Sequence, residues 1–168
     1  YDEVVAVPHV YRPALYRQLS SPVKSELWRE QIYRYLDRHK DLSAAQERFL
    51  RGVLDLATPG FFETGVDLAS ERGKALHRRL EHLRSRADRL FPKDPQLLGS
   101  LGPVDSQIVG FLVDPGGGGD LKCSCADASS YCGSGFHCDF GGCKEAPGCG
   151  FLWSYTCDGL CKTRPISN

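Results

Sequence analysis

Eight cysteines between residues 123 and 161 are the side chains of this sequence best able to do chemistry, and the 122 residues before them contain none. Thiolate sulfur can bind zinc or another soft metal, act as a redox centre, or be consumed in structural disulfides. These alternatives predict different spacings, so the gaps between the cysteines help to decide among them. The eight are Cys123, Cys125, Cys132, Cys138, Cys143, Cys149, Cys157 and Cys161.

The spacing argues against a metal centre and against a redox site. Structural zinc sites favour ligand pairs with about two to four intervening residues, and only Cys157 and Cys161 meet that condition. A thioredoxin-like site has about two residues between its cysteines beside alternating strands and helices, and the sequence has neither feature. Cys123 and Cys125 are spaced to chelate a soft metal, but the segment is too rich in aromatic residues for a thiolate cluster. We therefore expect no metal and no cofactor.

Structural disulfides account for the cysteines better. A segment of about 40 residues buries only a small core, which needs cross-links to hold a fold. Small secreted domains obtain these cross-links from disulfides formed in an oxidising compartment. We expect four disulfides, while the sequence does not choose among the possible pairings.

The same segment resembles a family of bacterial peptides. Its motifs are Cys123-Ser124-Cys125, the Ala128-Ser129 pair before Tyr131-Cys132, and Gly148-Cys149-Gly150 with Trp153 downstream. They resemble the cysteine framework of the fulvocin C-related bacteriocins over about 40 of the 168 residues. The chain departs from that framework at Cys157 and Cys161, because the bacteriocin has a closer final pair. The resemblance implies an exported bacterial protein with a bacteriocin-like tail, and longer secreted chains of this family have a helical front part with motifs similar to LWREQIYRYL.

Aromatic side chains among the cysteines are the candidates for binding a target. They can contact a target only if the fold exposes them, and the alternative is that they fill the small core of the tail. The candidates are Phe136, Phe140, Phe151, Trp153 and Tyr155.

The residues before the cysteines have the periodicity of a small helical domain, which we place at residues 1–98. The alternating apolar start predicts an extended arm or an edge strand. A short helix is expected from Pro13, and a longer one follows, with Ser21 as its cap and Pro22 at its first position. Its apolar residues recur at a spacing of four: Trp28, Ile32 and Leu36.

Two further helices have clear signals. Ser43 and Gln46 have the spacing of a capping box, with Leu42 as the staple residue, for a helix that ends near Ala57. Its inward residues should be Phe49, Leu50, Val53 and Leu56. A longer helix is expected from about Val66 to Phe91 with Leu76, Leu80, Leu83, Ala87 and Leu90 inward. We interpret the excess of lysine and arginine between residues 70 and 93 as a solvated face.

A connector at residues 99–120 separates the helical domain from the tail at residues 121–168. Its apolar run at 108–113 predicts a buried extended segment, and the glycines that follow predict a flexible linker. Gly118 and Gly119 also fit a double-glycine processing site. A linker fits the glycines better than a phosphate-binding loop, because Asp120 and Leu121 stand where that loop has its Lys and its Ser or Thr. The predicted fold class is mainly α, a small N-terminal helical bundle followed by a compact disulfide-rich C-terminal module with little regular structure.

Composition and histidine placement limit the classes of function. The 21 acidic and 21 basic residues balance, so we expect no nucleic acid partner. No apolar run approaches the roughly 20 residues that span a bilayer. The start YDEVV without Met predicts an extracellular chain whose signal segment has been removed. His77 and His82 lie about 140° apart on one helix and read as solvated, and His137 adjoins a cysteine expected in a disulfide, so we expect no enzyme.

Two functions remain open at this stage. The first is a secreted antibacterial, bacteriocin-like protein whose disulfide-stabilised tail binds a component of the target-cell surface. The alternative is a non-toxic secreted binding or assembly subunit that docks onto a larger protein complex at the cell surface.

Overall fold

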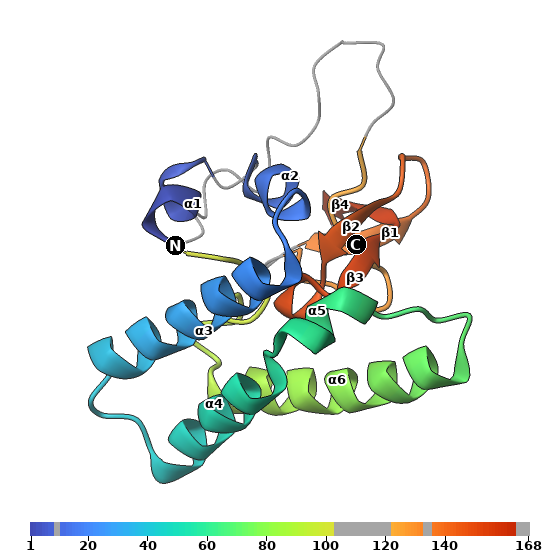
Figure 1. The fold of residues 1–168 in the computed structure, drawn as a ribbon. Coiled ribbons are helices and arrows are strands. Elements are labelled where there is room, and N and C mark those ends of the chain that lie inside the picture. The colour runs from blue at the N-terminus through green and yellow to red at the C-terminus, as the bar shows by residue number, and fades with distance from the viewer. Residues whose placement is uncertain (9–10, 103–121, 133–135, 164–168) are drawn as a thin grey trace.

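Helices occupy the first ninety residues of the protein and short strands occupy the end (Figure 1). The structure is a computed structural model that describes residues 1–8, 11–102, 122–132 and 136–163. The helices are α1 (Asp2–Ala6), α2 (Arg12–Arg17), α3 (Ser21–Arg38), α4 (Ala44–Leu56), α5 (Pro59–Thr64) and α6 (Glu71–Leu90). The remaining elements are β1 (Phe136–Phe140), β2 (Ala146–Cys149), the short 3₁₀ turn η2 (Phe151–Trp153), β3 (Tyr155–Cys157) and β4 (Gly159–Thr163). The predicted order of a helical part and a disulfide-rich tail is confirmed.

The N-terminal residues form a helix, so the expectation of an extended arm or edge strand is wrong. Asp2 and Glu3 lie in the first turn of α1, where negative charge is stabilising. Val4 is buried, and the carboxylate of Asp2 forms an ion pair with Arg34 of α3. This guanidinium holds the pKa of Asp2 below its usual range. Tertiary contacts therefore decide the conformation of these few residues over their alternating pattern.

Helices α3 and α4 form much as their sequence signals predict. α3 has Ser20 as its N-cap, one residue earlier than expected, and it buries Trp28 and Ile32. In α4 both capping-box bonds are present: Ser43 Oγ accepts from Gln46 N at 3.3 Å, and Gln46 Oε1 accepts from Ser43 N at 2.9 Å. Leu54, which the pattern missed, is buried on α4, while Leu56 is only partly buried.

The long helix expected from Val66 to Phe91 begins later. Residues 59–64 form the separate helix α5, and α6 starts only at Glu71 because Ser70 caps it, accepting from Gly73 N at 3.0 Å. Of the residues predicted to face inward on this helix, Leu80 and Ala87 are buried. None of the described helices is long and apolar enough to cross a membrane.

The tail has more regular structure than predicted. β1 pairs with β4, and β2 pairs with β3, giving two antiparallel two-stranded sheets. Cys138 lies opposite Cys161 in the first pair, and Ala146 lies opposite Cys157 in the second. These short strand pairs exist because disulfides and turns hold the strands in register. Strands this short lack the long alternating pattern by which a sequence indicates a strand.

Buried side chains of the helices and of the tail belong to a single hydrophobic cluster. The tail contributes Phe151, Leu152, Trp153 and Tyr155 to it, and the helices contribute Tyr16, Trp28 and Leu80 among others. In Figure 1 the strands lie against α2, α3 and α5. The predicted extended segment at 108–113 and the possible processing site at Gly118 and Gly119 lie outside the described residues.

Candidate functional site

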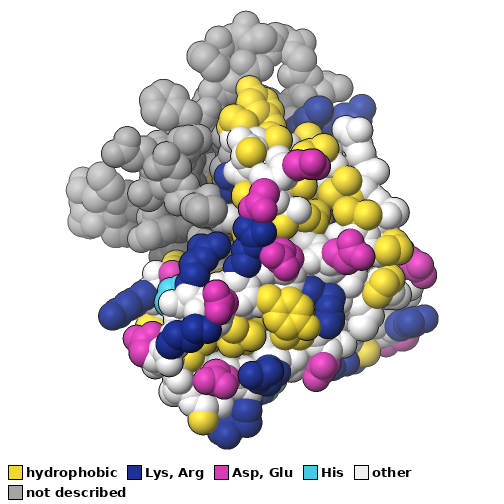
Figure 2. Space-filling view, turned by 60° about the vertical axis from the view of Figure 1, so that its left-hand side comes forward, with side chains coloured by type: hydrophobic (Ala, Val, Ile, Leu, Met, Phe, Trp, Pro, Cys, Tyr) yellow, Lys and Arg dark blue, Asp and Glu magenta, His cyan; other side chains and the backbone are white. Residues whose placement is uncertain are grey.

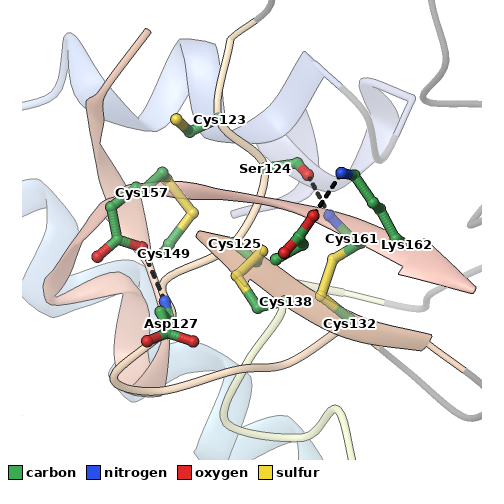
Figure 3. Close-up of a disulfide and its surroundings, with 12 residues drawn as sticks. Cys123, Ser124, Cys125, Asp127, Cys132, Cys138, Cys149, Cys157, Cys161 and Lys162 are labelled. Carbon is green, nitrogen blue, oxygen red and sulfur yellow. Dashed lines mark hydrogen bonds and ion pairs between the residues drawn. A yellow bond between two sulfur atoms is a disulfide. The ribbon is translucent and has the colours of Figure 1, made fainter. Parts of the chain in front are cut away.

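Four disulfides join all eight cysteines and build the framework of the tail. Figure 3 shows the bridges Cys125–Cys138, Cys132–Cys161 and Cys149–Cys157. The segment at 122–132 runs across the sheet of β1 and β4 and is tied to it at two points. The pairs are Cys123–Cys143, Cys125–Cys138, Cys132–Cys161 and Cys149–Cys157. Backbone bonds reinforce this crossing, because Ser124 N donates to Gly159 O at 2.9 Å and Cys161 N donates to Ser124 Oγ at 3.2 Å.

The closest group of sulfur atoms has no capacity left for a metal. The sulfurs of Cys125, Cys132 and Cys138 lie within 4.8 Å of one another because two disulfides stack at this place. Each of these sulfurs is bonded to another sulfur, and a disulfide sulfur is not the thiolate that binds a metal. All eight cysteines are described and none is free, so none of them can serve as a nucleophile while the bridges are intact.

The segment at 97–102 is held by two polar side chains that the sequence analysis did not single out. Gln31 donates from Nε2 to the carbonyls of Leu97 at 2.6 Å and Ser100 at 2.7 Å, and its Oε1 accepts from Gly102 N. Arg12 donates to Leu101 O at 2.6 Å and also to carbonyls near the N-terminus. Burial lowers the pKa of Arg12, and these carbonyls offset the cost of burying its charge.

The fixed segment receives the tail at one tight turn. Leu152 N donates to Leu98 O at 2.8 Å, and Trp153 Nε1 donates to Gly99 O at 2.8 Å. Leu152 and Trp153 both have φ near 50°, in the left-handed region that costs a non-glycine residue about 1–2 kcal/mol. Contacts with the helices offset that cost, because the ring of Trp153 meets Tyr16 and Trp28 edge to face at centroid distances of 5.0 and 5.9 Å.

Further polar contacts join α6 to the tail. The hydroxyl of Tyr155 lies 3.1 Å from Nδ1 of His77, so His77 is not the solvated side chain that was predicted. His82 is exposed, as predicted. The guanidinium of Arg84 lies 5.5 Å from the centre of the Tyr131 ring. Burial raises the pKa of Tyr131 and of Tyr155, so both hydroxyls stay protonated around neutral pH.

A cleft of about 510 Å³ lies between the helices and the tail. Its walls come from both parts of the chain. One wall comprises Tyr16, Arg17 and Lys24, another the residues 62–68, and the tail adds Phe140, Glu145, Pro147, Thr156 and Asp158 among others. Val66 N donates to Ser154 O at 3.0 Å at the base, so the loop after α5 is bonded to the tail there. Pockets of this size commonly bind ligands or side chains of a partner.

The cleft has an excess of negative charge. It is lined by the four carboxylates of Glu63, Asp67, Glu145 and Asp158 against two cations. Both cationic side chains already make contacts within the chain, because Arg17 Nε donates to Pro13 O at 3.0 Å and Lys24 Nζ lies over the ring of Tyr16. The glutamates and Asp67 are exposed, so they are accessible to a partner.

Two large apolar side chains are exposed on the same cleft. Leu68 is 41% exposed and Phe140 is 69% exposed, and both line the cleft. An exposed apolar side chain in a hollow bordered by charge is typical of a protein interface, in which a desolvated centre is surrounded by a polar rim.

Only some of the predicted binding aromatics are accessible. Phe151, Trp153 and Tyr155 are buried, so these three side chains fill the core and do not face a target. Phe136 is half-buried and Phe140 is exposed. Of the cleft residues that the sequence analysis did not name, Leu68 and the four carboxylates come from distant segments with no shared motif. The loop after α5 also contains Val66, which is buried, so no sequence signal distinguishes Leu68 as the exposed residue.

The cleft offers four carboxylates, two cationic side chains and two exposed apolar side chains. This arrangement is equipped to bind a partner, through charge and apolar contact. No family model matches the chain, and neither the curated proteins nor the solved structures contain a match.

Proposed function

We propose that the protein is a secreted binding module that docks onto a protein partner through the cleft between its helices and its tail. The observation that carries this proposal is that both parts of the chain build the cleft and share one hydrophobic core. A tail that acted alone would lose both walls that the helical part contributes to this cleft. The four disulfides are compatible with the oxidising, extracellular setting that the proposal requires.

The chemistry of the cleft defines the partner. Four carboxylates favour a segment that carries lysine or arginine, and the exposed Leu68 and Phe140 favour an apolar side chain beside those cations. We therefore propose a basic segment with one apolar anchor, presented by a larger protein at the cell surface. Such a contact needs no chemistry from this chain.

Photo-crosslinking from the cleft tests this proposal. A photoreactive phenylalanine analogue at position 140, introduced into the full chain made by the producing cells, should form one discrete crosslinked product. The double change Glu63→Lys and Glu145→Lys should reduce that product by about tenfold or more, because like charges would then face the basic partner. The measurement is the yield of the crosslinked band, followed by mass spectrometry of the captured peptide.

Two controls make the result specific to the cleft. Tyr33 is 47% exposed on α3 and does not line the cleft, so the same analogue there should give no such product. Glu26→Lys places a charge reversal at an exposed site away from the cleft and should leave the yield unchanged. Equal products from positions 33 and 140, or a yield that is indifferent to the glutamate changes, would argue against the proposal.

An antibacterial function is the second candidate, and the cysteine framework favours it. The eight cysteines whose order resembles the fulvocin C-related bacteriocins are all bridged. In the intact chain the helices cover Trp153 of the tail through Tyr16 and Trp28. An effector tail would therefore be masked until the contact between Trp153 and the helices opens. In this second candidate the helical part would restrain the tail.

A viability assay tests the second candidate. Oxidised full-length protein and the same protein after reduction and alkylation are added to indicator bacteria at micromolar concentration. Killing that requires the intact disulfides is the expected result if the framework is an effector scaffold. An oxidised chain that leaves viability unchanged, both intact and after cleavage at an engineered protease site beside Gly119, would remove this candidate.

A further inference from the structure

The exposed side of α6 has a concentration of arginine that does not line the cleft, and of these arginines Arg86 also contacts the ring of Phe49. Five arginines on this helix are exposed, and among the described residues no ion pair joins any of them to an acid. They are Arg72, Arg78, Arg79, Arg86 and Arg89. We define these five as the α6 arginine face.

Helical geometry places these arginines in one band. At 3.6 residues per turn, they lie within about 120° of the helix circumference. Glu81 and Asp88 lie outside the band, about 60° and 80° beyond the edge that Arg78 marks. Glu71, at the start of the band, is paired with Lys74 at 2.7 Å. The band extends over about 25 Å along the helix. Figure 1 shows α6 at the edge of the fold, below α5 and the tail.

The face that comes forward in Figure 2 does not have this character. On the face that comes forward in Figure 2, basic and acidic side chains are interspersed with hydrophobic ones. The ion pairs of Arg34 with Asp2 and of Lys40 with Asp37, on α1 and around the end of α3, are of this mixed kind. The whole chain has a formal net charge of zero, so the α6 arginine face is a local excess against an acidic cleft elsewhere.

We propose that the α6 arginine face holds the protein against an anionic lipid surface by pairing its guanidinium groups with lipid phosphates. Arginine presents a planar fork of donors that suits phosphate. A protein interface would need an apolar or aromatic centre, and between the arginines this face offers only small or polar side chains such as Ala75, His82 and Ser85. Electrostatic adsorption to lipid needs no such centre. The choice of lipid over nucleic acid rests on the extracellular location proposed above.

Vesicle binding tests this inference with the full oxidised chain. The protein should co-sediment with vesicles of equal parts phosphatidylglycerol and phosphatidylcholine, not with pure phosphatidylcholine, and about 0.5 M NaCl should release it. Each lost arginine should weaken the partition coefficient about fivefold, so R78Q/R79Q/R89Q should weaken it about a hundredfold. Arg86 is left unchanged because its guanidinium contacts the ring of Phe49.

A matched variant separates position from net charge. R38Q/K122Q/K144Q removes the same charge from exposed sites outside α6, and it should keep most of the binding. The inference is overturned if both triple variants lose binding equally, or if vesicles of pure phosphatidylcholine bind the protein as well as the anionic vesicles do. It is also overturned if the protein binds a single-stranded oligonucleotide as tightly as it binds the anionic vesicles. These outcomes do not depend on the cleft, whose own test is the crosslink from position 140.

Discussion

Replacing Trp153 with alanine is expected to lower the free energy of unfolding of the whole chain by about 3–5 kcal/mol. Trp153 belongs to the tail in sequence but lies between Tyr16 and Trp28 of the helices, and its indole N–H bonds to Gly99 O. Truncation would leave a cavity at the centre of the shared core and a carbonyl without its partner. The expected observation is a denaturant midpoint that falls together for helical circular dichroism and for the hydrogen-exchange protection of the tail amides.

The control for this prediction is Phe140→Ala. Phe140 is aromatic and in the tail, but it is 69% exposed, so its truncation should change the unfolding free energy by no more than about 0.5 kcal/mol. The shared core would be contradicted if Trp153→Ala loosened the tail while the helices unfolded at their original denaturant concentration. Helix and tail would then be separate cooperative units, and the cleft would not be a rigid site.

Removing the Cys132–Cys161 bridge by changing both residues to alanine should cost about 3.6 kcal/mol of unfolding free energy. This bridge joins residues separated by 29 positions, the longest separation of the four, so its loss releases the largest loop in the unfolded chain. Both residues lie in the framework that fixes segment 122–132 against β4. Urea unfolding of the variant, with the other three bridges verified by mass, measures the loss.

The Cys149–Cys157 bridge provides the comparison. It joins residues only 8 positions apart, and chain entropy predicts a smaller cost of about 2.5 kcal/mol for its removal. It also closes the turn that carries Leu152 and Trp153 in the left-handed region. If C149A/C157A proved more damaging than C132A/C161A, loop entropy would not be the main contribution, and fixing Trp153 against the helices would be the principal role of the shorter bridge.

Helices were predictable where their signals are local. The capping box of Ser43 and Gln46 and the spacing of Trp28 and Ile32 depend on neighbours within a few residues, and the helices formed accordingly. Short elements were not predictable from such local signals. Residues 2–6 alternate like a strand yet form α1, because the pairing of Asp2 with Arg34 and the burial of Val4 outweigh a weak local preference.

The cleft was not predictable from the sequence. Leu68, Phe140 and Glu145 come from three distant segments, and no periodicity or spacing relates them. Their proximity depends on how the tail docks, which in turn depends on Gln31 and Arg12 fixing the segment that receives Trp153. Which of the five candidate aromatics are buried and which are exposed was likewise not predictable, because burial depends on the assembled core.

The order of the residues was enough to predict the helices that became α3 and α4 and the cross-linking of the tail, because helix signals are local and a tail this small cannot hold a fold without bridges. The pairing of the cysteines, the burial of Trp153 and the acidic cleft between helices and tail emerged only from the folded structure. These features arise from contacts between residues far apart in the chain. The free energy of such contacts depends on mutual burial and distance, and neither is present in the order of the residues.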